Sequence, residues 1–199
     1  MDILNTSNGQ ILRALTIASQ YHNGLMRKSE PIPAIIHPIT VALIVAMHKR
    51  DPDVISAALL HDILEDTAYT SNQLKTDFGP KVAWLVNGVS VLEADCDNQA
   101  SWRQRKKAYI DKIAVNEFDH MLICTADKIH NLSSLIMSHK TQGDKLWDAF
   151  NASSQEYAWY YTTLLQTLRK QFRHPLVDQL GQLIELAEPI MNQSLATIE

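Results

Sequence analysis

The stretch AALLHDILEDT, residues 57–67, decides the interpretation of the whole chain. It begins as a leucine-rich segment with helical periodicity and then carries four ionisable side chains within two turns: His61, Asp62, Glu65 and Asp66. At about 100° per residue, these four lie within an arc of roughly 140°, and leucine and isoleucine fill the opposite side. Carboxylates buried there without compensation would protonate or destabilise the fold. A divalent cation is the natural compensation, because it favours ionised oxygens.

A solvated polar stripe on an amphipathic helix is the simpler alternative. It explains any single one of the four residues well, but it explains the group poorly, because the stretch contains no lysine or arginine to pair with the carboxylates. The spacing also differs from HExxH, in which two histidines at i and i+4 bind zinc. The group therefore indicates a metal site of a different kind from that of the zinc proteases.

Helical periodicity continues on both sides of this stretch. Asp51 has the character of an N-cap with Pro52 at the first helical position, and Gly79-Pro80 is expected to separate two helices. His37 precedes Pro38, which disfavours helical geometry at His37. Helices are expected at about 7–21, 39–49, from 52 into the quoted stretch, shortly after 70, and at about 81–92, 100–115, 119–137, 144–172 and 175–196. The pattern predicts one all-α domain over residues 1–199, with about eight to ten helices.

The composition is that of an ordinary globular protein, with 46% hydrophobic and 20% charged residues among 199. A formal net charge of −4 gives no support to nucleic-acid or membrane binding, so an anionic substrate would need local cations or a metal. Cys96 and Cys124 form no CxxC pair, which argues against a disulfide framework or a zinc finger. The N-terminal residues do not resemble a signal peptide, and no apolar run approaches the roughly 20 residues that span a bilayer. These features predict a cytoplasmic protein; they leave the oligomeric state open.

Further metal ligands are expected from other parts of the chain. His37 is one candidate, although it could equally cap a helix. The segment HMLICTADKIHNLSSLI, residues 120–136, carries a polar stripe on an otherwise apolar helix, at i, i+3, i+4 and i+7: Asp127, His130, Asn131 and Ser134. Such an aspartate is by itself more often structural than catalytic. Lys128 is expected to pair with Asp127 only poorly, because it lies one position away and points elsewhere.

Two imidazoles and two carboxylates can be combined from these segments: His37, His61, Asp62 and Asp127. A mixed set of nitrogen and oxygen ligands suits Mn²⁺, Fe²⁺ or Zn²⁺, with open positions for water and substrate. The sequence therefore predicts a catalytic or binding site around one divalent metal.

Five blocks in this order resemble the HD-domain metal-dependent phosphohydrolases: HNGLMRK, IIHPITVA, AALLHDILEDT, FGPKVAWLVNGVS and ADKIHNL. The finer resemblance is to the (p)ppGpp hydrolase domains of RelA/SpoT homologues and to the stand-alone small alarmone hydrolases. The core motifs cover about residues 21–161, since EYAWYY at 156–161 resembles a later block. The Glu-Asp pair after HD is the distinguishing feature, because the general superfamily requires only HD. The resemblance implies a single-domain helical HD-domain bundle.

The resemblance also implies roles for individual residues. It implies metal ligands around Mn²⁺ at four positions: His37, His61, Asp62 and Asp127. It implies that Glu65 and Asp66 position and deprotonate the attacking water, which agrees with general acid–base chemistry beside a metal. Contacts to the nucleotide are implied for four residues: Arg27, Lys28, Asn131 and Tyr157. From the residues alone, Arg27 and Lys28 could equally be a solvated charge pair, and Tyr157 could belong to the core.

The implied reaction removes pyrophosphate from the ribose 3′ position, turning ppGpp into GDP and pppGpp into GTP, and so ends or modulates the stringent response. Three departures from the family pattern lie near the expected substrate: Ala34 in place of a tyrosine, Ser90-Val91 in place of Thr-Lys, and Ser133 in place of an arginine. A related substrate, such as an adenosine 3′-pyrophosphate or that of another HD nucleotidase, is therefore an open alternative. A nucleotide-sensing domain without catalysis is another.

Overall fold

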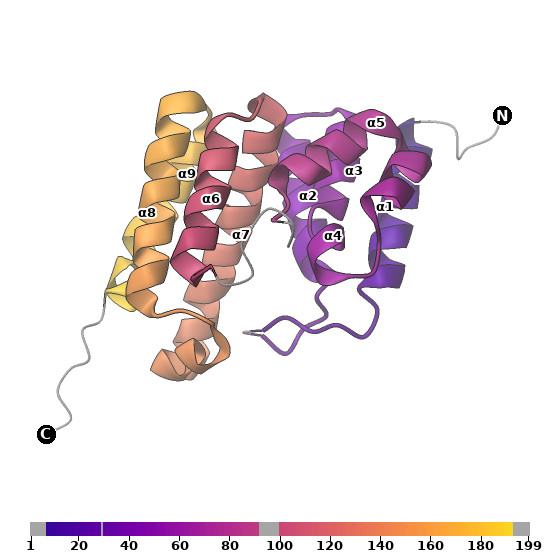
Figure 1. Cartoon of the computed structure of the whole chain (residues 1–199). Coiled ribbons are helices and arrows are strands. Elements are labelled where there is room, and N and C mark those ends of the chain that lie inside the picture. Colours follow the sequence, from indigo (N-terminus) through magenta and orange to yellow (C-terminus); the bar gives the residue numbers. More distant parts are fainter. Residues whose placement is uncertain (1–6, 29, 92–99, 193–199) are drawn as a thin grey trace, which may run out of the picture.

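The computed structural model describes residues 7–28, 30–91 and 100–192, and within these ranges the chain is all-α (Figure 1). The extended segment before α2 contributes an isolated bridge between Met26 and Pro33. This architecture confirms the predicted fold class. The helices are α1 (Ser7–Tyr21), α2 (Ile36–His48), α3 (Pro52–Leu60), α4 (Ile63–Asp66), α5 (Ser71–Val89), α6 (Trp102–Ala114), α7 (Phe118–Gln142), the 3₁₀-helix η3 (Gly143–Ala149), α8 (Ser154–Gln171) and α9 (Pro175–Met191).

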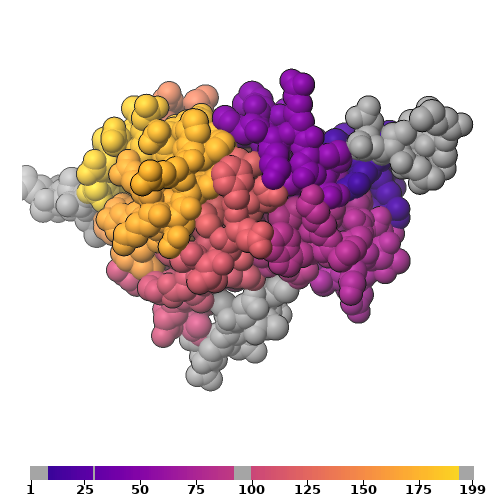
Figure 2. Space-filling view, turned by 90° about the horizontal axis from the view of Figure 1, so that it is seen from above, coloured from indigo at the N-terminus to yellow at the C-terminus, as the bar shows by residue number. Residues whose placement is uncertain are grey.

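Helix α7 joins the two ends of the molecule. It packs against α2, α3 and α5 on one side and against α9 on the other, while α3 lies against α1, α2 and α5. Seen from above, the N-terminal helices and the C-terminal pair α8 and α9 occupy opposite ends, with residues of α6 and α7 between them (Figure 2). Since α2, α3 and α7 are mutual neighbours, side chains from three distant parts of the chain can meet at one place. Within the described ranges, none of the helices has the length and apolar character that crossing a bilayer requires.

The quoted stretch is broken, which corrects the expectation of one continuous helix. Asp51 caps α3 as predicted, its side chain accepting from the backbone N–H of Asp53 at 3.0 Å, but α3 ends at Leu60. His61 and Asp62 form a turn before the short helix α4. The expectation of four buried ionisable groups is also wrong. His61 is buried and Asp62 partly buried, whereas Glu65 and Asp66 are exposed where they line a cavity.

Helix α2 begins one residue before His37, so the expectation that His37 lies outside helical geometry is wrong. Ile35 already has helical torsion angles (φ −57°, ψ −22°), and the N–H of His37 donates to the carbonyl of Ala34 at 3.0 Å. The turn is therefore established before Pro38, whose missing N–H costs nothing in the first turn of a helix. The pre-proline effect is a preference, and packing of α2 against α3 and α7 overrides it here.

The remaining helices follow the predicted punctuation with one exception. Thr70 caps α5 with a capping box, and Gly79 breaks this helix with a φ of 83°, as expected from Gly79-Pro80. The single helix expected over 144–172 is wrong. Gly143 (φ 59°) ends α7, η3 follows, and Ser153 caps α8 by accepting from the N–H of Glu156. Of the two cysteines, Cys124 is buried and free, and Cys96 lies outside the described residues.

Candidate functional site

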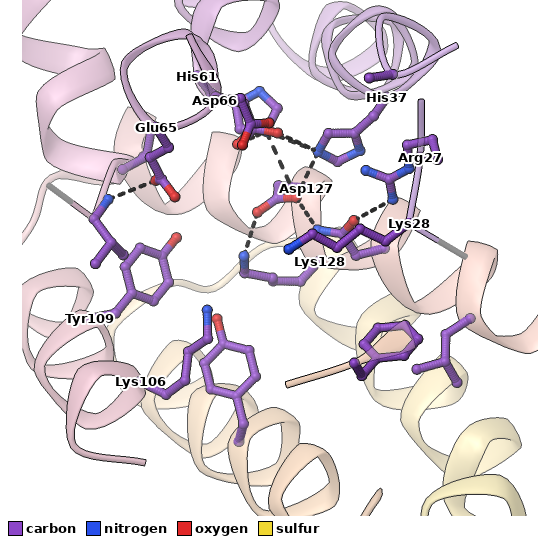
Figure 3. A pocket seen from close by; sticks show the side chains of 18 of the residues that line it. Arg27, Lys28, His37, His61, Glu65, Asp66, Lys106, Tyr109, Asp127 and Lys128 are labelled. Atoms are coloured by element: carbon purple, nitrogen blue, oxygen red, sulfur yellow. Dashed lines mark hydrogen bonds and ion pairs between the residues drawn. The ribbon is translucent and has the colours of Figure 1, made fainter. Parts of the chain in front are cut away.

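Three of the four predicted metal ligands, His37, His61 and Asp127, point toward one another between α2, the α3–α4 turn and α7 (Figure 3). Asp62, the fourth, lies against both imidazoles. Nε2 of His37 lies 3.2 Å from Oδ2 of Asp62 and 3.2 Å from Oδ1 of Asp127. Nε2 of His61 lies 3.1 Å from Oδ1 of Asp62 and 3.8 Å from Oδ1 of Asp127. The two imidazole Nε2 atoms are 3.1 Å apart. Two imidazole nitrogens and three carboxylate oxygens thus lie close together.

The orientation of both imidazoles is set by contacts at their other nitrogen. Nδ1 of His61 lies 2.8 Å from the carbonyl oxygen of Ala58, so it carries the hydrogen and donates. Nδ1 of His37 lies 2.8 Å from Nδ1 of His130. Burial, with His37 and Arg27 adding to it, lowers the pKa of His130 to about 4, so His130 is neutral and can accept. Each imidazole therefore turns Nε2 toward the shared space, as outer contacts do for metal-binding histidines.

These distances fit a bound divalent cation. Metal bonds to nitrogen and oxygen are about 2.0–2.2 Å long, so neighbouring ligand atoms around one ion lie about 3 Å apart. His37, His61 and Asp127 each offer one ligand atom within 4.8 Å of the others, and all three are buried. Two imidazole lone pairs that face each other at 3.1 Å would repel unless a cation or a proton lies between them. The donor set therefore has the composition and the spacing of a metal centre.

Without a metal, protons take over this compensation. Burial alone would lower the pKa of His61, but Asp62 and Asp127 outweigh it and raise that pKa to about 9. Burial likewise works to raise the pKa of Asp62, yet His61 and His37 hold it well below its usual range. The cluster thus stabilises positive charge at its centre.

The expectation that Lys128 pairs only poorly with Asp127 is wrong. Nζ of Lys128 lies 2.5 Å from Oδ2 of Asp127, and Oδ1 of the same carboxylate accepts from the side-chain amide of Asn131. Both charged side chains are largely buried, at 13% and 8% exposure. Neighbouring positions on a helix point apart, but the long lysine side chain bends back toward Asp127, with its ammonium group 5.1 Å from the ring centre of Tyr109 and 5.9 Å from that of Tyr160. Lys128 therefore holds Asp127 ionised and oriented toward His37.

Removal of the metal should lower the melting temperature, and the loss should depend on pH. In the metal-free protein, the pKa of His61 is about 9 in the fold and 6.5 when unfolded, so its proton stabilises the fold fully below pH 6.5 and not at all above pH 9. Stability should therefore fall across that window by at most about 3 kcal/mol. Glu65 acts in the same direction, because burial and Asp62 raise its pKa to about 7 and its ionisation is thereby unfavourable.

Thermal unfolding at pH 6, 7.5 and 9, with chelator and with Mn²⁺, measures both effects. The metal competes with protons for the imidazoles, so its stabilising effect should grow as the pH rises. Identical melting curves with chelator and with Mn²⁺ at all three pH values would contradict a buried metal centre.

Glu65 and Asp66 lie beside the cluster and line the same cavity. Oε1 of Glu65 accepts from the backbone N–H of Val91 at 2.7 Å, which fixes the carboxylate at the end of α5 (Figure 3). Although both side chains are open to water in the cavity, protein atoms surround them. Burial and the charge of Asp62 accordingly raise the pKa of both groups, that of Glu65 to about 7. A carboxylate with a pKa near neutrality is suited to take a proton from water.

The cavity measures about 470 Å³, and all four residues with implied nucleotide contacts line it. Nη2 of Arg27 donates to Oδ1 of Asn131 at 2.9 Å, so the loop before α2 is tied to α7. Lys28 is exposed at the rim, and Tyr157 reaches the cavity from α8. Within the described residues, Nε of Arg27 is buried and has no hydrogen-bond partner.

The three departures from the family pattern lie at different distances from the cavity. Ala34 and Val91 line it. Ser90 is buried behind the cavity, where its hydroxyl donates to the carbonyl of His61 at 3.1 Å. This hydrogen bond helps to hold the turn that carries His61 and Asp62. Ser133 donates to the carbonyl of Ile129 on its own helix. Ala34 and Val91 are therefore the departures that place a shorter side chain than the family's at the cavity wall.

Sequence reasoning missed several residues that line the cavity, including Lys106 on α6 and Tyr160 on α8. For Lys128, the sequence predicts no role in the site. Lys106 lies in the basic run RQRKK, which is typical of a solvated helix face. A helical wheel for residues 100–115 would have placed Lys106 with Tyr109, Ile110 and Ile113 on the buried side, and this was the available signal.

Comparisons with known proteins agree with this geometry. The guanosine-3′,5′-bis(diphosphate) 3′-pyrophosphohydrolase of Haemophilus influenzae is 38% identical over 125 residues, which are 60% of this chain and 18% of that protein. The bifunctional (p)ppGpp synthase/hydrolase SpoT of Escherichia coli K12 is 36% identical over 132 residues, 63% of this chain and 18% of that protein. The chain thus spans less than a fifth of the length of these curated relatives.

Among solved structures, a metazoan ortholog of SpoT, described as hydrolysing ppGpp and acting in starvation responses, superimposes with a TM-score of 0.73 at 26% identity. The match covers 89% of this chain and 94% of that one. A protein of Listeria monocytogenes EGD-e superimposes with a TM-score of 0.66 at 25% identity, over 77% and 96% of the two chains. The family model of the HD domain matches residues 14–151, well over half of the sequence. The chain therefore belongs to the HD-domain family.

Proposed function

We propose that this chain is a metal-dependent 3′-pyrophosphohydrolase of (p)ppGpp, which converts ppGpp to GDP and pyrophosphate, converts pppGpp to GTP and pyrophosphate, and so ends or modulates the stringent response. The observation that carries the proposal is the convergence of the ligand atoms of His37, His61 and Asp127 within 4.8 Å, on the wall of a cavity that Glu65 also lines. The names of the curated relatives and the description of the metazoan structure support the same substrate.

The proposed metal ligands are His37, His61, Asp62 and Asp127, and Mn²⁺ is the proposed ion. When bound, a divalent cation would supply Lewis-acid chemistry, lowering the pKa of a nearby water and offsetting phosphate charge. The chain itself contributes the orientation of this centre. His130 and the Ala58 carbonyl set the two imidazoles, and Lys128 keeps Asp127 ionised.

Glu65 is the proposed general base, with Asp66 helping to position the water. The N–H of Val91 holds one oxygen of Glu65 and leaves the other free to accept a proton. The attacking water forms a bond to the phosphorus next to the 3′ oxygen, the bond from that phosphorus to the 3′ oxygen breaks, and the 3′ oxygen takes up a proton. Glu65 is suited to accept the proton of the attacking water, since its position leaves one oxygen free and its pKa is raised to about 7.

Arg27, Lys28, Asn131 and Tyr157 are the proposed contacts to the rest of the nucleotide. The guanidinium group of Arg27 is held by Asn131 and keeps a buried donor free, which suits recognition of an anionic oxygen. A chain with a net charge of −4 must place cations locally to attract a polyanionic substrate.

Incubation of the purified protein with ppGpp and Mn²⁺, followed by ion-exchange separation of the nucleotides, should show GDP and pyrophosphate in equal amounts. Release of orthophosphate or of a nucleoside would instead identify another HD nucleotidase. Absence of turnover in a preparation that contains metal would contradict the substrate assignment. Because Ala34 lines the cavity in place of a tyrosine, the same assay should include an adenosine 3′-pyrophosphate.

Four further properties of the protein stay predictions. They are the identity of Mn²⁺ as the native ion, the organisation of residues 1–199 as a single HD-domain unit, the cytoplasmic location, and a nucleotide as the partner in place of nucleic acid or membrane.

A further inference from the structure

Two lysine side chains reach the cavity from α6 and α7. The ammonium groups of Lys106 and Lys128 lie 5.3 and 5.9 Å from the centre of the same aromatic ring, that of Tyr160. Both lysines line the cavity that contains the metal-ligand cluster, and the ammonium group of Lys106 is directed into it (Figure 3). Lys128 is already bound to Asp127, so the pair of lysines adjoins the proposed metal centre.

Lys106 differs in its surroundings from four other lysines of the fold. Among the described residues, none provides a carboxylate within ion-pair distance of its Nζ, whereas Lys49, Lys81, Lys107 and Lys128 each have such a partner. Burial, and then repulsion by Lys128, lower its pKa to about 8, so at pH 7 it still carries its charge most of the time. An ammonium group enclosed by protein without a direct ion-pair partner is unfavourable. Glu65 and Asp127 offset part of this cost from a greater distance, and an anion in the cavity would offset more of it.

A free hydrogen-bond donor lies in the same place. The hydroxyl of Tyr160 is buried and has no hydrogen-bond partner among the described residues. Tyr160 as a whole is only 3% exposed. Lys128 has three donor hydrogens, of which Asp127 accepts from one. The wall formed by Lys106, Lys128 and Tyr160 therefore offers several hydrogen-bond donors to a bound oxyanion, beside the carboxylates of Asp127 and Glu65.

A second cavity of about 360 Å³ continues from this wall. It shares Lys106, Glu65 and Tyr157 with the first cavity and adds Trp102 and Arg105. Lys106 thus lies where the two cavities meet. Arg27 and Lys28 lie on the loop before α2, a different element from α6 and α7, and Lys28 lines the second cavity as Lys106 does.

We propose that Lys106, Lys128 and Tyr160 form an anion site that holds the two-phosphate group of the substrate during hydrolysis and then binds the product, inorganic pyrophosphate. The assignment of this group rests on the proposed function. It follows from position, because Lys128 contacts a proposed metal ligand, so the anion held here is the one next to the cluster. Arg27, which Asn131 holds, is then left for the phosphates at the other end of the nucleotide.

Calorimetric titration of the metal-loaded protein with inorganic pyrophosphate tests the site directly. Lys106→Met removes the charge and keeps the length of the side chain, and Lys107→Met is the matched control, because Lys107 is exposed on the same helix and pairs with Asp111. A hydrogen bond to a charged group contributes enough that Lys106→Met should weaken pyrophosphate binding about tenfold or more. Lys107→Met should leave it unchanged, and Lys106→Arg should retain most of it.

Metal content and circular dichroism of each variant, measured after titration, ensure that neither lost metal nor misfolding explains the result. Failure of the wild type to bind pyrophosphate, or equal binding by wild type and Lys106→Met, would overturn the site. If ppGpp is not hydrolysed but pyrophosphate binding still depends on Lys106, the anion site stands and the substrate assignment fails. If ppGpp is hydrolysed and pyrophosphate inhibits wild type and Lys106→Met equally, the proposed function stands and the anion site fails.

Discussion

Replacement of Asp127 by asparagine should abolish retention of the metal and reduce hydrolysis of ppGpp on the order of 10³-fold or more, since a catalytic metal contributes several kcal/mol to transition-state stabilisation. Asp127 lies 3.2 Å from His37, is only 6% exposed, and is the partner of Lys128. The asparagine variant therefore loses a metal ligand and also leaves Lys128 buried without its counter-charge. Removal of one partner of a buried ion pair typically costs about 3–5 kcal/mol, so the melting temperature should fall as well.

Metal analysis after gel filtration, the ppGpp assay and thermal unfolding measure these three effects. Asp62→Asn separates them, because it removes a proposed ligand and leaves the pair of Lys128 and Asp127 intact. Asp119→Asn is the matched control: Asp119 lies on α7 as Asp127 does, but it pairs with Lys49 outside the cavity. If the Asp127→Asn protein keeps its metal and its turnover, Asp127 is not a metal ligand.

The double substitution Glu65→Gln, Asp66→Asn should lower turnover by about 10²–10⁴-fold, the usual contribution of a general base, while metal content stays at the wild-type level. Glutamine can still accept from the N–H of Val91, so the local geometry is preserved and only the proton acceptor is lost. Of the two single variants, Glu65→Gln should account for most of the loss, because the carboxylate of Glu65 is held by the backbone N–H of Val91, just after α5.

Single-turnover kinetics with ppGpp, together with metal analysis, give the required comparison. Glu156→Gln on α8 serves as a control, since Glu156 does not line the cavity. Wild-type rates in the double variant would exclude both carboxylates as the general base. Another group would then accept the proton of the attacking water. Loss of metal together with activity would instead make one of them a ligand.

Most of the helical organisation could be predicted because its signals are local. Asp51 and Gly79 act through their own backbone neighbours, and the structure confirms both. The four proposed ligands could likewise be chosen from the chain, because histidines and carboxylates within apolar helices need compensation wherever they fold. The failures concern places where a distant contact outweighs a local preference, as at His37, which lies in a helix despite Pro38.

Local patterns along the chain were enough to predict a helical protein and to select two histidines and two aspartates as candidate metal ligands. They also placed Glu65 and Asp66 one turn after the His61-Asp62 pair. The packed fold was needed to reveal that the quoted stretch breaks at His61, that Lys128 bends back onto Asp127, and that Lys106 lines the cavity. The reason is that periodicity describes one helix at a time. Charge compensation depends on distances between helices, which exist only after α2, α3, α6 and α7 have packed.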